Sequence, residues 1–97
     1  MVNIAFLPAA DADYQEALAW YQARSPQAAA GFEAAVEVAL RSIGDAPERW
    51  TSCDDRHRFY ILWRYPYSII YRVEAGGVLV VAVAHASRSA SYWQGRG

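Results

Sequence analysis

The sequence predicts an α+β domain in which an N-terminal helical hairpin packs on a mostly antiparallel β-sheet, in the order β-α-α-β-β-β. Three observations predict this fold. Apolar residues recur with helical spacing in the first half, two aromatic and β-branched runs flank Tyr65-Pro66, and an unbroken apolar run follows two glycines near the end. Ninety-seven residues suffice for one core, so we expect a single domain over residues 1–97.

Residues 2–7 predict a short strand, and the segment after them predicts a helix over about residues 8–23. Pro8 suits the first helical turn, because the N–H that proline lacks would have no partner there. Carboxylates fall early in the helix, where they interact favourably with its dipole: Asp11, Asp13 and Glu16. The positions of one apolar stripe are Tyr14, Ala17, Leu18 and Tyr21.

A second helix is predicted to begin at Ser25-Pro26, where a serine N-cap precedes a proline at the first helical position. Its apolar stripe is regular and consists of Phe32, Ala35, Val36, Ala39, Leu40 and Ile43. Gly44 is expected to end this helix as a left-handed cap, with Pro47 beyond it. The short connection predicts that the two helices form an antiparallel hairpin.

The second half predicts the rest of the sheet. Residues 48–57 form a polar connection, and residues 58–64 and 67–73 predict a hairpin that reverses at Tyr65-Pro66. After Gly76-Gly77, the apolar run over residues 78–85 predicts a central strand that is covered on both faces.

Alternation places arginines on one face of each hairpin strand. The first strand carries Arg58, Tyr60, Leu62 and Arg64 on one face, and the second carries Ser68, Ile70 and Arg72. We expect these faces to form one basic aromatic platform, of the kind that receives phosphates and stacks bases. An acidic protein segment is an alternative ligand, and solvent-exposed arginines with no ligand are another.

Charge is distributed unevenly along the chain. Residues 1–55 carry three arginines and nine carboxylates, a net charge of −6, whereas residues 56–97 carry six arginines and one glutamate, a net charge of +5. This asymmetry predicts a basic side with an anionic partner, and the alternative is that folding evens the charges out. All nine cations are arginine.

Composition also predicts what the protein lacks. Cys53 is the single cysteine, and His57 has no partner at metal-ligand spacing, so we expect no disulfide, no metal and no cofactor. We expect Cys53 to be unreactive. No apolar run is long enough to span a bilayer and no signal peptide is evident, so we expect a cytoplasmic protein without membrane contact.

His85 ends the apolar strand and has two interpretations. A histidine at a strand end can face a surface groove and carry a proton near neutral pH. The plainer interpretation is a histidine that is hydrogen-bonded into the last turn.

Over nearly the whole chain these residues resemble the ParE and RelE superfamily of small toxins from bacterial type II toxin–antitoxin systems. The resemblance is strongest in Tyr65-Pro66-Tyr67-Ser68-Ile69-Ile70-Tyr71-Arg72-Val73 and in Val83-Ala84-His85-Ala86-Ser87-Arg88 followed by Tyr92-Trp93. It implies a toxin that a cognate ParD-like antitoxin neutralises. The residues that we expect to bind the target or the antitoxin are Arg58, Tyr60, Arg64, Arg72, Arg88, Tyr92 and Trp93.

The superfamily contains two activities, and the resemblance is closer to ParE. RelE-like members resemble one another in cutting mRNA in the ribosome with lysines on the first hairpin strand and two arginines further on. Phe59, Tyr60 and Ile61 occupy the lysine positions here, Ser68 replaces one arginine and only Arg88 matches.

Similarity to ParE implies inhibition of DNA gyrase by a protein that is not itself a hydrolase. One alternative is a ribosome-dependent mRNA endoribonuclease that uses His85, Arg88, Arg72 and Tyr92. The other is a non-toxic protein that only binds an antitoxin.

Overall fold

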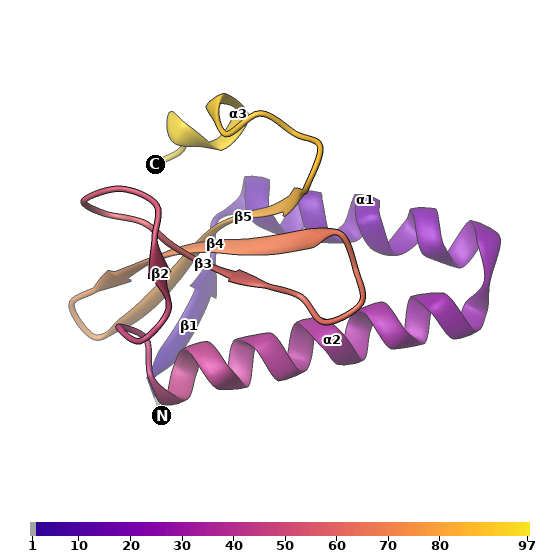
Figure 1. Ribbon diagram of the computed structural model, residues 1–97, viewed down its shortest axis with the longest axis horizontal. Coiled ribbons are helices and arrows are strands. Elements are labelled where there is room, and N and C mark those ends of the chain that lie inside the picture. Colours follow the sequence, from indigo (N-terminus) through magenta and orange to yellow (C-terminus); the bar gives the residue numbers. More distant parts are fainter. Residues whose placement is uncertain (1) are drawn as a thin grey trace.

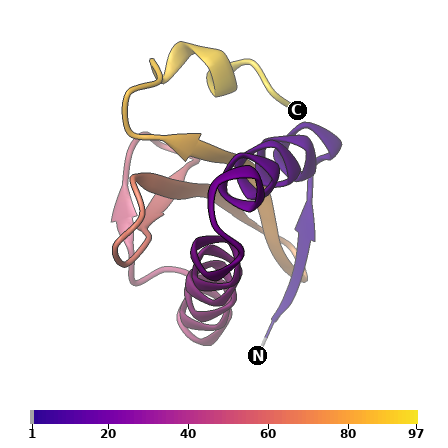
Figure 2. The same cartoon turned by 90° about the vertical axis from the view of Figure 1, so that its right-hand side faces the viewer.

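The structure, a computed structural model, describes residues 2–97 as one sheet with two long helices and a short C-terminal helix (Figure 1). The strands are β1 (Asn3–Phe6), β2 (Thr51–Ser52), β3 (Arg58–Ile61), β4 (Tyr67–Glu74) and β5 (Gly77–His85). The helices are α1 (Pro8–Arg24), α2 (Pro26–Asp45) and α3 (Ser91–Gln94). Figure 2 shows α3 on the side of the sheet opposite α2.

The sheet has the strand order β1-β5-β4-β3-β2. β1 runs parallel to β5 and the other neighbours are antiparallel, which confirms the predicted α+β fold. β5 lies between β1 and β4, as expected for its unbroken apolar run. The prediction omitted β2, because Thr51 and Ser52 form only two rungs with β3 inside a stretch without strand composition.

The helical hairpin begins as predicted and ends differently. The Ser25 hydroxyl oxygen accepts from the Ala28 N–H at 3.2 Å, which makes Ser25 the N-cap of α2. The expectation for Gly44 was wrong, because Gly44 lies inside α2 and is buried. The Ser42 carbonyl accepts from the Ala46 N–H at 3.3 Å and from Trp50 Nε1 at 3.2 Å. This carbonyl is therefore bonded without a left-handed cap.

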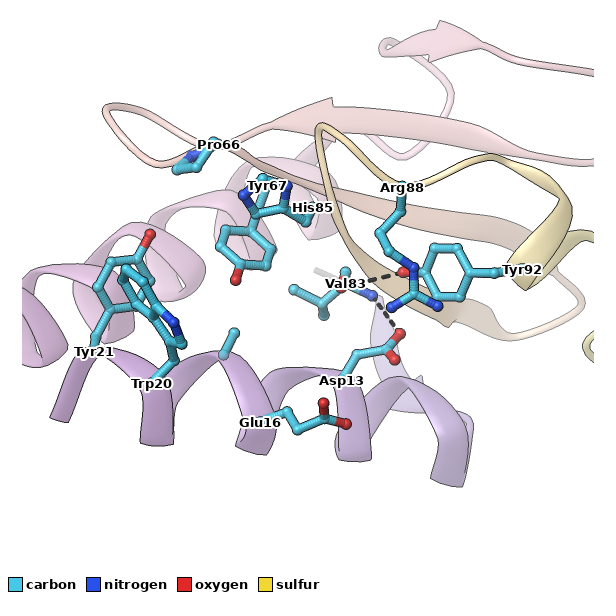
Figure 3. A pocket seen from close by; sticks show the side chains of 11 residues that line it. Asp13, Glu16, Trp20, Tyr21, Pro66, Tyr67, Val83, His85, Arg88 and Tyr92 are labelled. Carbon is cyan, nitrogen blue, oxygen red and sulfur yellow. Dashed lines mark hydrogen bonds between the residues drawn. The ribbon is translucent and has the colours of Figure 1, made fainter. Parts of the chain in front are cut away.

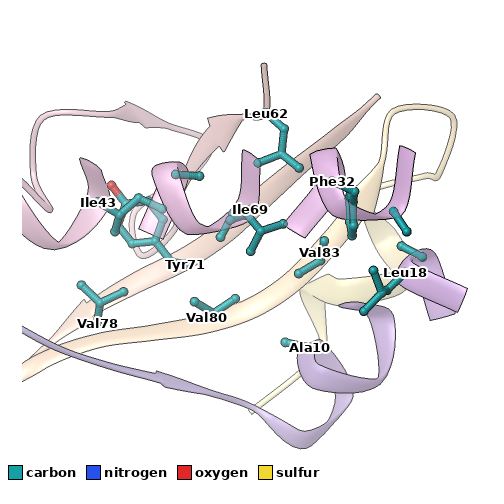
Figure 4. Close-up of a cluster of buried hydrophobic side chains, with 14 residues drawn as sticks. Ala10, Leu18, Phe32, Ile43, Leu62, Ile69, Tyr71, Val78, Val80 and Val83 are labelled. Carbon is teal, nitrogen blue, oxygen red and sulfur yellow. The ribbon is translucent and has the colours of Figure 1, made fainter. Parts of the chain in front are cut away.

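The sheet is covered on both faces, as predicted for β5. On the α1 and α2 side, the buried stripe of α2 packs on β4 and β5 (Figure 4), with Phe32, Val36, Ala39, Ile43, Ile69, Tyr71, Val80 and Val83 in one cluster. The Tyr71 hydroxyl in this cluster donates to the Pro47 carbonyl at 2.6 Å. On the other side, Trp93 of α3 packs with Ile70, Val81, Ala82 and Ala84.

The hairpin formed by β3 and β4 corrects two predictions. β3 ends at Ile61 instead of residue 64, and the chain turns through residues 62–66, where Arg64 has a φ of 68°. Residues directly opposite each other share a face, and the register pairs Tyr60 with Ile69 and Phe59 with Ile70. Even-numbered residues of β3 therefore share a face with odd-numbered residues of β4. The expectation of one basic platform was wrong, because its two halves lie on opposite faces.

Candidate functional site

A cleft of about 320 Å³, the α1–β5 cleft, lies between α1 and the C-terminal end of β5 (Figure 3). It forms there because β1 is shorter than β5. The pairing of β1 with β5 ends at Phe6 and Val80, the Leu7 N–H that follows donates to the Val80 carbonyl at 2.9 Å, and the edge of β5 after Val80 faces α1. The lining residues are Asp13, Glu16, Ala17, Trp20, Tyr21, Pro66, Tyr67, Val83, His85, Arg88 and Tyr92.

Asp13 ties three segments together at one end of the cleft. Its carboxylate accepts from the Val83 N–H at 3.1 Å and from both terminal nitrogens of Arg96, at 2.7 and 3.2 Å. Arg96 also donates to the Val81 carbonyl at 3.0 Å. The hydrogen bond to Asp13 raises the pKa of the Arg96 guanidinium. The side chains of Asp13 and Arg96 thus bond the Val83 N–H and the Val81 carbonyl, which lie on the part of the β5 edge that β1 does not cover.

Arg88 and Tyr92 form the wall opposite α1. The guanidinium carbon of Arg88 lies 3.8 Å from the centroid of the Tyr92 ring, a cation–π contact. The Tyr92 hydroxyl points to the Val83 carbonyl at 3.4 Å (Figure 3). Burial raises the pKa of Tyr92 to about 12. Tyr92 is therefore a neutral phenol at pH 7 and not a base.

The buried tyrosines predict alkaline destabilisation. Burial raises the pKa of Tyr71 and of Tyr92 from 10.0 to about 12. Between these values the unfolded chain binds fewer protons than the folded chain, so the free energy of unfolding falls as the pH rises, by up to about 2 kcal/mol for each tyrosine. Below pH 10 this stabilisation is fully present.

Urea unfolding between about pH 9 and about pH 12 measures this effect, and Tyr92→Phe should make the decline smaller by up to about 2 kcal/mol. A wild-type stability that stays constant over this window would contradict the prediction.

His85 lies in the cleft but is held by the turn that follows it. Its Nδ1 accepts from the Ser87 N–H at 3.0 Å and lies 2.8 Å from the Ser87 hydroxyl oxygen. Because a backbone N–H can only donate, the proton of the neutral ring is on Nε2. The edge of the Tyr67 ring packs against His85, with the centroids 5.0 Å apart. This arrangement agrees with the plainer of the two interpretations of His85.

Aromatic side chains continue the cleft along α1 (Figure 3). Trp20 is half exposed and packs edge-on against Tyr21, with the centroids 5.1 Å apart. The guanidinium carbon of Arg24 lies 3.6 Å from the centroid of the Trp20 ring. The cleft therefore combines an exposed aromatic surface with carboxylates on α1 and a cation at Arg88. Such a surface suits protein recognition, in which tryptophan, tyrosine and arginine dominate.

Two structural features bear on the class of the protein. Within residues 2–97, no helix has both the length and the apolarity needed to cross a bilayer. Over the same residues, no group of three or more histidine, cysteine, aspartate and glutamate side chains is placed to hold a metal ion.

Comparison with protein families identifies the chain. The model of the ParE toxin of the type II toxin–antitoxin system, parDE, matches residues 4–90. The chain belongs to the ParE toxin family. A solved chain from the chromosomal ParDE TA system of P. aeruginosa has the same fold, with a TM-score of 0.76 and 16% identity, over 90% of this chain and 98% of that chain. A search of curated proteins gave no match.

This ParE-family chain does not bring together all four residues of the nuclease alternative. His85, Arg88 and Tyr92 line the α1–β5 cleft. Arg72 lies elsewhere: its side chain is buried, and its Nε donates to Glu74 at 3.2 Å. The four side chains therefore do not form a single site in this structure.

The residues predicted to bind a partner are also dispersed over this ParE fold. Only Arg88 and Tyr92 of that set line the cleft. Arg58 donates to the Trp50 carbonyl at 2.7 Å, and Tyr60 packs against the Trp50 ring. Arg64 lies in the exposed turn after β3. Arg72 is buried, and Trp93 is only 5% exposed because it covers the second core cluster.

Sequence reasoning missed Asp13, Glu16, Trp20 and Arg96 as parts of a site in this ParE toxin. Trp20 carried a usable signal, because it is a large aromatic residue outside the apolar stripe of α1. Asp13 and Arg96 carried none, since 83 positions separate them and their pairing depends on the fold.

Proposed function

We propose that this ParE toxin inhibits DNA gyrase, is not a hydrolase, acts in the cytoplasm and is neutralised by a cognate ParD-like antitoxin. One observation carries the choice of a protein target over RNA. Phe59, Ser68 and Arg88 line one shallow hollow on the α3 side of the sheet, together with Cys53, Ile70, Ala84, His85, Ala86, Ala90 and Trp93. Phe59 and Ser68 occupy positions that are cationic in RelE-like nucleases. Both lie in the same hollow as Arg88, and both are neutral here.

The chemistry of RNA cleavage explains the weight of this observation. Removing one positioned proton-transfer group typically costs about 10²- to 10⁴-fold in rate. Phe59 and Ser68 supply neither a cation nor a group that titrates near neutral pH. Arg88 is the one lysine or arginine among the residues that line this hollow, so it alone would supply a permanent cation for the phosphate.

The α1–β5 cleft is the surface that we assign to the target. Arg88 is exposed, and no carboxylate within residues 2–97 lies within 4.0 Å of its nitrogen atoms. Trp20 is exposed on the α1 side of the same cleft. Exposed arginine and tryptophan side chains around one cleft are typical anchors of a protein interface.

A supercoiling assay with purified gyrase tests the proposal. We expect the toxin to inhibit supercoiling, and we expect Arg88→Ala to raise the toxin concentration for half-inhibition at least about tenfold. Arg41→Ala is the matched control, because Arg41 is exposed on α2 and does not line the cleft. Wild-type toxin in excess that leaves gyrase active would refute the choice of target.

The endoribonuclease alternative keeps one supporting observation, because His85, Arg88 and Tyr92 share the cleft. Primer extension on mRNA from a translation reaction would then reveal toxin-dependent cuts that His85→Ala abolishes. Induction of the gene without an antitoxin, followed by colony counts, separates both toxic activities from a protein that only binds an antitoxin.

A further inference from the structure

Two arginines contact the ring of Tyr92 in the α1–β5 cleft. The guanidinium carbon of Arg88 lies 3.8 Å from the ring centroid, and that of Arg96 lies 4.9 Å from it. The two guanidiniums differ in their bonding. Arg96 donates to both carboxylate oxygens of Asp13. In contrast, no carboxylate within residues 2–97 lies within 4.0 Å of the Arg88 nitrogens. One cation is therefore paired within the protein, and the other is available to a partner.

The Tyr92 ring is fixed at the edge of β5. Its hydroxyl donates to the Val83 carbonyl at 3.4 Å, and the Asp13 carboxylate accepts from the Val83 N–H at 3.1 Å. Trp93, the next residue of α3, is only 5% exposed and packs in the second core cluster. The ring is therefore held by the edge of β5 and, through its neighbour in α3, by the core.

Arg88 is held at both of its ends. Its backbone N–H donates to the His85 carbonyl at 3.0 Å, which fixes the start of the side chain in the turn after β5. Its guanidinium lies over the Tyr92 ring (Figure 3). Contact with a ring face leaves the in-plane N–H donors of a guanidinium free for hydrogen bonds. A side chain that is ordered in advance loses less conformational entropy on binding, so this arrangement should strengthen binding by Arg88.

We propose that Tyr92 is a positioning residue, which orders the Arg88 guanidinium in the α1–β5 cleft so that its donors meet an acceptor group of the target. Asp13 and Arg96 support the ring beside the edge of β5. The aromatic face of Tyr92 makes the contact, so phenylalanine should replace it and leucine should not. This inference rests on the proposed function for the identity of the target, and it adds which residues hold the arginine that contacts it.

NMR spectroscopy of the free toxin tests whether Tyr92 orders Arg88. A guanidinium over an aromatic ring should have an Nε–H proton resonance that the ring displaces upfield, and the loss of one such signal in Arg88→Ala assigns it. We expect Tyr92→Leu to abolish the displacement and Tyr92→Phe to retain it. A resonance that is the same in Tyr92→Leu as in wild type would overturn the positioning role.

The same measurement tests the support beneath the ring. Asp13→Asn preserves the shape of the side chain but removes its charge, so it should loosen Arg96 and reduce the displacement of the Arg88 resonance. An unchanged displacement in Asp13→Asn would overturn the supporting role of the ion pair.

The supercoiling assay tests whether the ordering of Arg88 matters for inhibition. We expect Tyr92→Leu to raise the toxin concentration for half-inhibition at least about fivefold, and Tyr92→Phe to recover most of this loss. In an Arg88→Ala background, Tyr92→Leu should raise that concentration less than about twofold, because the residue through which Tyr92 acts is absent. Equal effects in the two backgrounds would overturn action through Arg88.

Trp50→Leu is the matched control for the loss of a ring. Trp50 is partly buried, the guanidinium carbon of Arg49 lies 5.3 Å from its ring centroid, and it does not line the cleft. This variant should inhibit gyrase like wild type at a temperature at which thermal unfolding shows every variant to be folded. A loss as large as that in Tyr92→Leu would attribute the effect to destabilisation and overturn the positioning role.

The two experiments separate this inference from the proposed function. Wild-type toxin that leaves gyrase active would overturn the target and, with it, the contribution of Tyr92 to inhibition. The NMR result does not depend on gyrase, so it decides by itself whether Tyr92 orders Arg88. Wild-type toxin that inhibits gyrase no better than Tyr92→Leu would overturn the contribution of Tyr92 alone.

Discussion

Phe32→Ala is expected to lower the free energy of unfolding by about 4 kcal/mol, because the ring is fully buried and its removal leaves a cavity. Four tyrosine rings surround Phe32. Their centroids lie 5.7 Å (Tyr14), 5.2 Å (Tyr21), 5.6 Å (Tyr65) and 5.3 Å (Tyr67) from the Phe32 centroid. The cavity cannot close easily, because rings from α1, α2 and the β3–β4 turn all meet there.

Urea unfolding of the purified protein measures this loss. Phe32→Leu is the matched control, and it should cost about 1 kcal/mol because it preserves most of the apolar volume. Tyr21 and Tyr67 also line the α1–β5 cleft, so Phe32→Ala should weaken gyrase inhibition as well. An alanine variant as stable as the leucine variant would contradict the view that this ring is central to the core.

Asp13→Ala is expected to cost about 3 kcal/mol of stability, because removing one partner of a largely buried ion pair leaves the other charge without compensation. The side chains of Asp13 and Arg96 are 14% and 19% exposed. The substitution also leaves the Val83 N–H without its acceptor. The C-terminal segment should loosen, and the amide of Val83 should exchange faster with solvent.

Asp11→Ala is the control for this experiment, since Asp11 is exposed near the start of the same helix and should contribute less than about 0.5 kcal/mol. Combining Asp13→Ala with Arg96→Ala should cost less than the sum of the two single changes. Strictly additive effects would show that the two side chains do not stabilise each other.

Local sequence was a reliable guide to the buried face and the start of α2. The apolar stripe of α2 predicted six core residues, of which Phe32, Val36, Ala39 and Ile43 are buried and Ala35 and Leu40 are partly buried. Ser25-Pro26 predicted the start of α2 correctly. The superfamily was recognisable for the same reason, because its motifs are runs of residues that are neighbours in the sequence. A ParE family model matches residues 4–90.

Predictions failed where two elements had to be combined. Alternation within β3 and β4 was correct, yet the basic platform was wrong because pairing register decides which faces coincide. Gly44 looked like a helix end, but the Trp50 side chain and the Ala46 N–H both bond the Ser42 carbonyl. The structure also placed Arg72 and Trp93 in the interior, which side-chain chemistry alone does not predict.

The sequence by itself determined the order of α1, α2 and the strands β1, β3, β4 and β5, the stripes that form the core, and the family. Each of these depends on the spacing of residues close together in the chain. Only the tertiary structure decided that the edge of β5 beyond β1 opens toward α1, that Asp13 meets Arg96 there, and that Trp63 stays outside the core beside α2. These contacts join residues far apart in sequence, and sheet register and helix packing fix them only when the whole chain has folded.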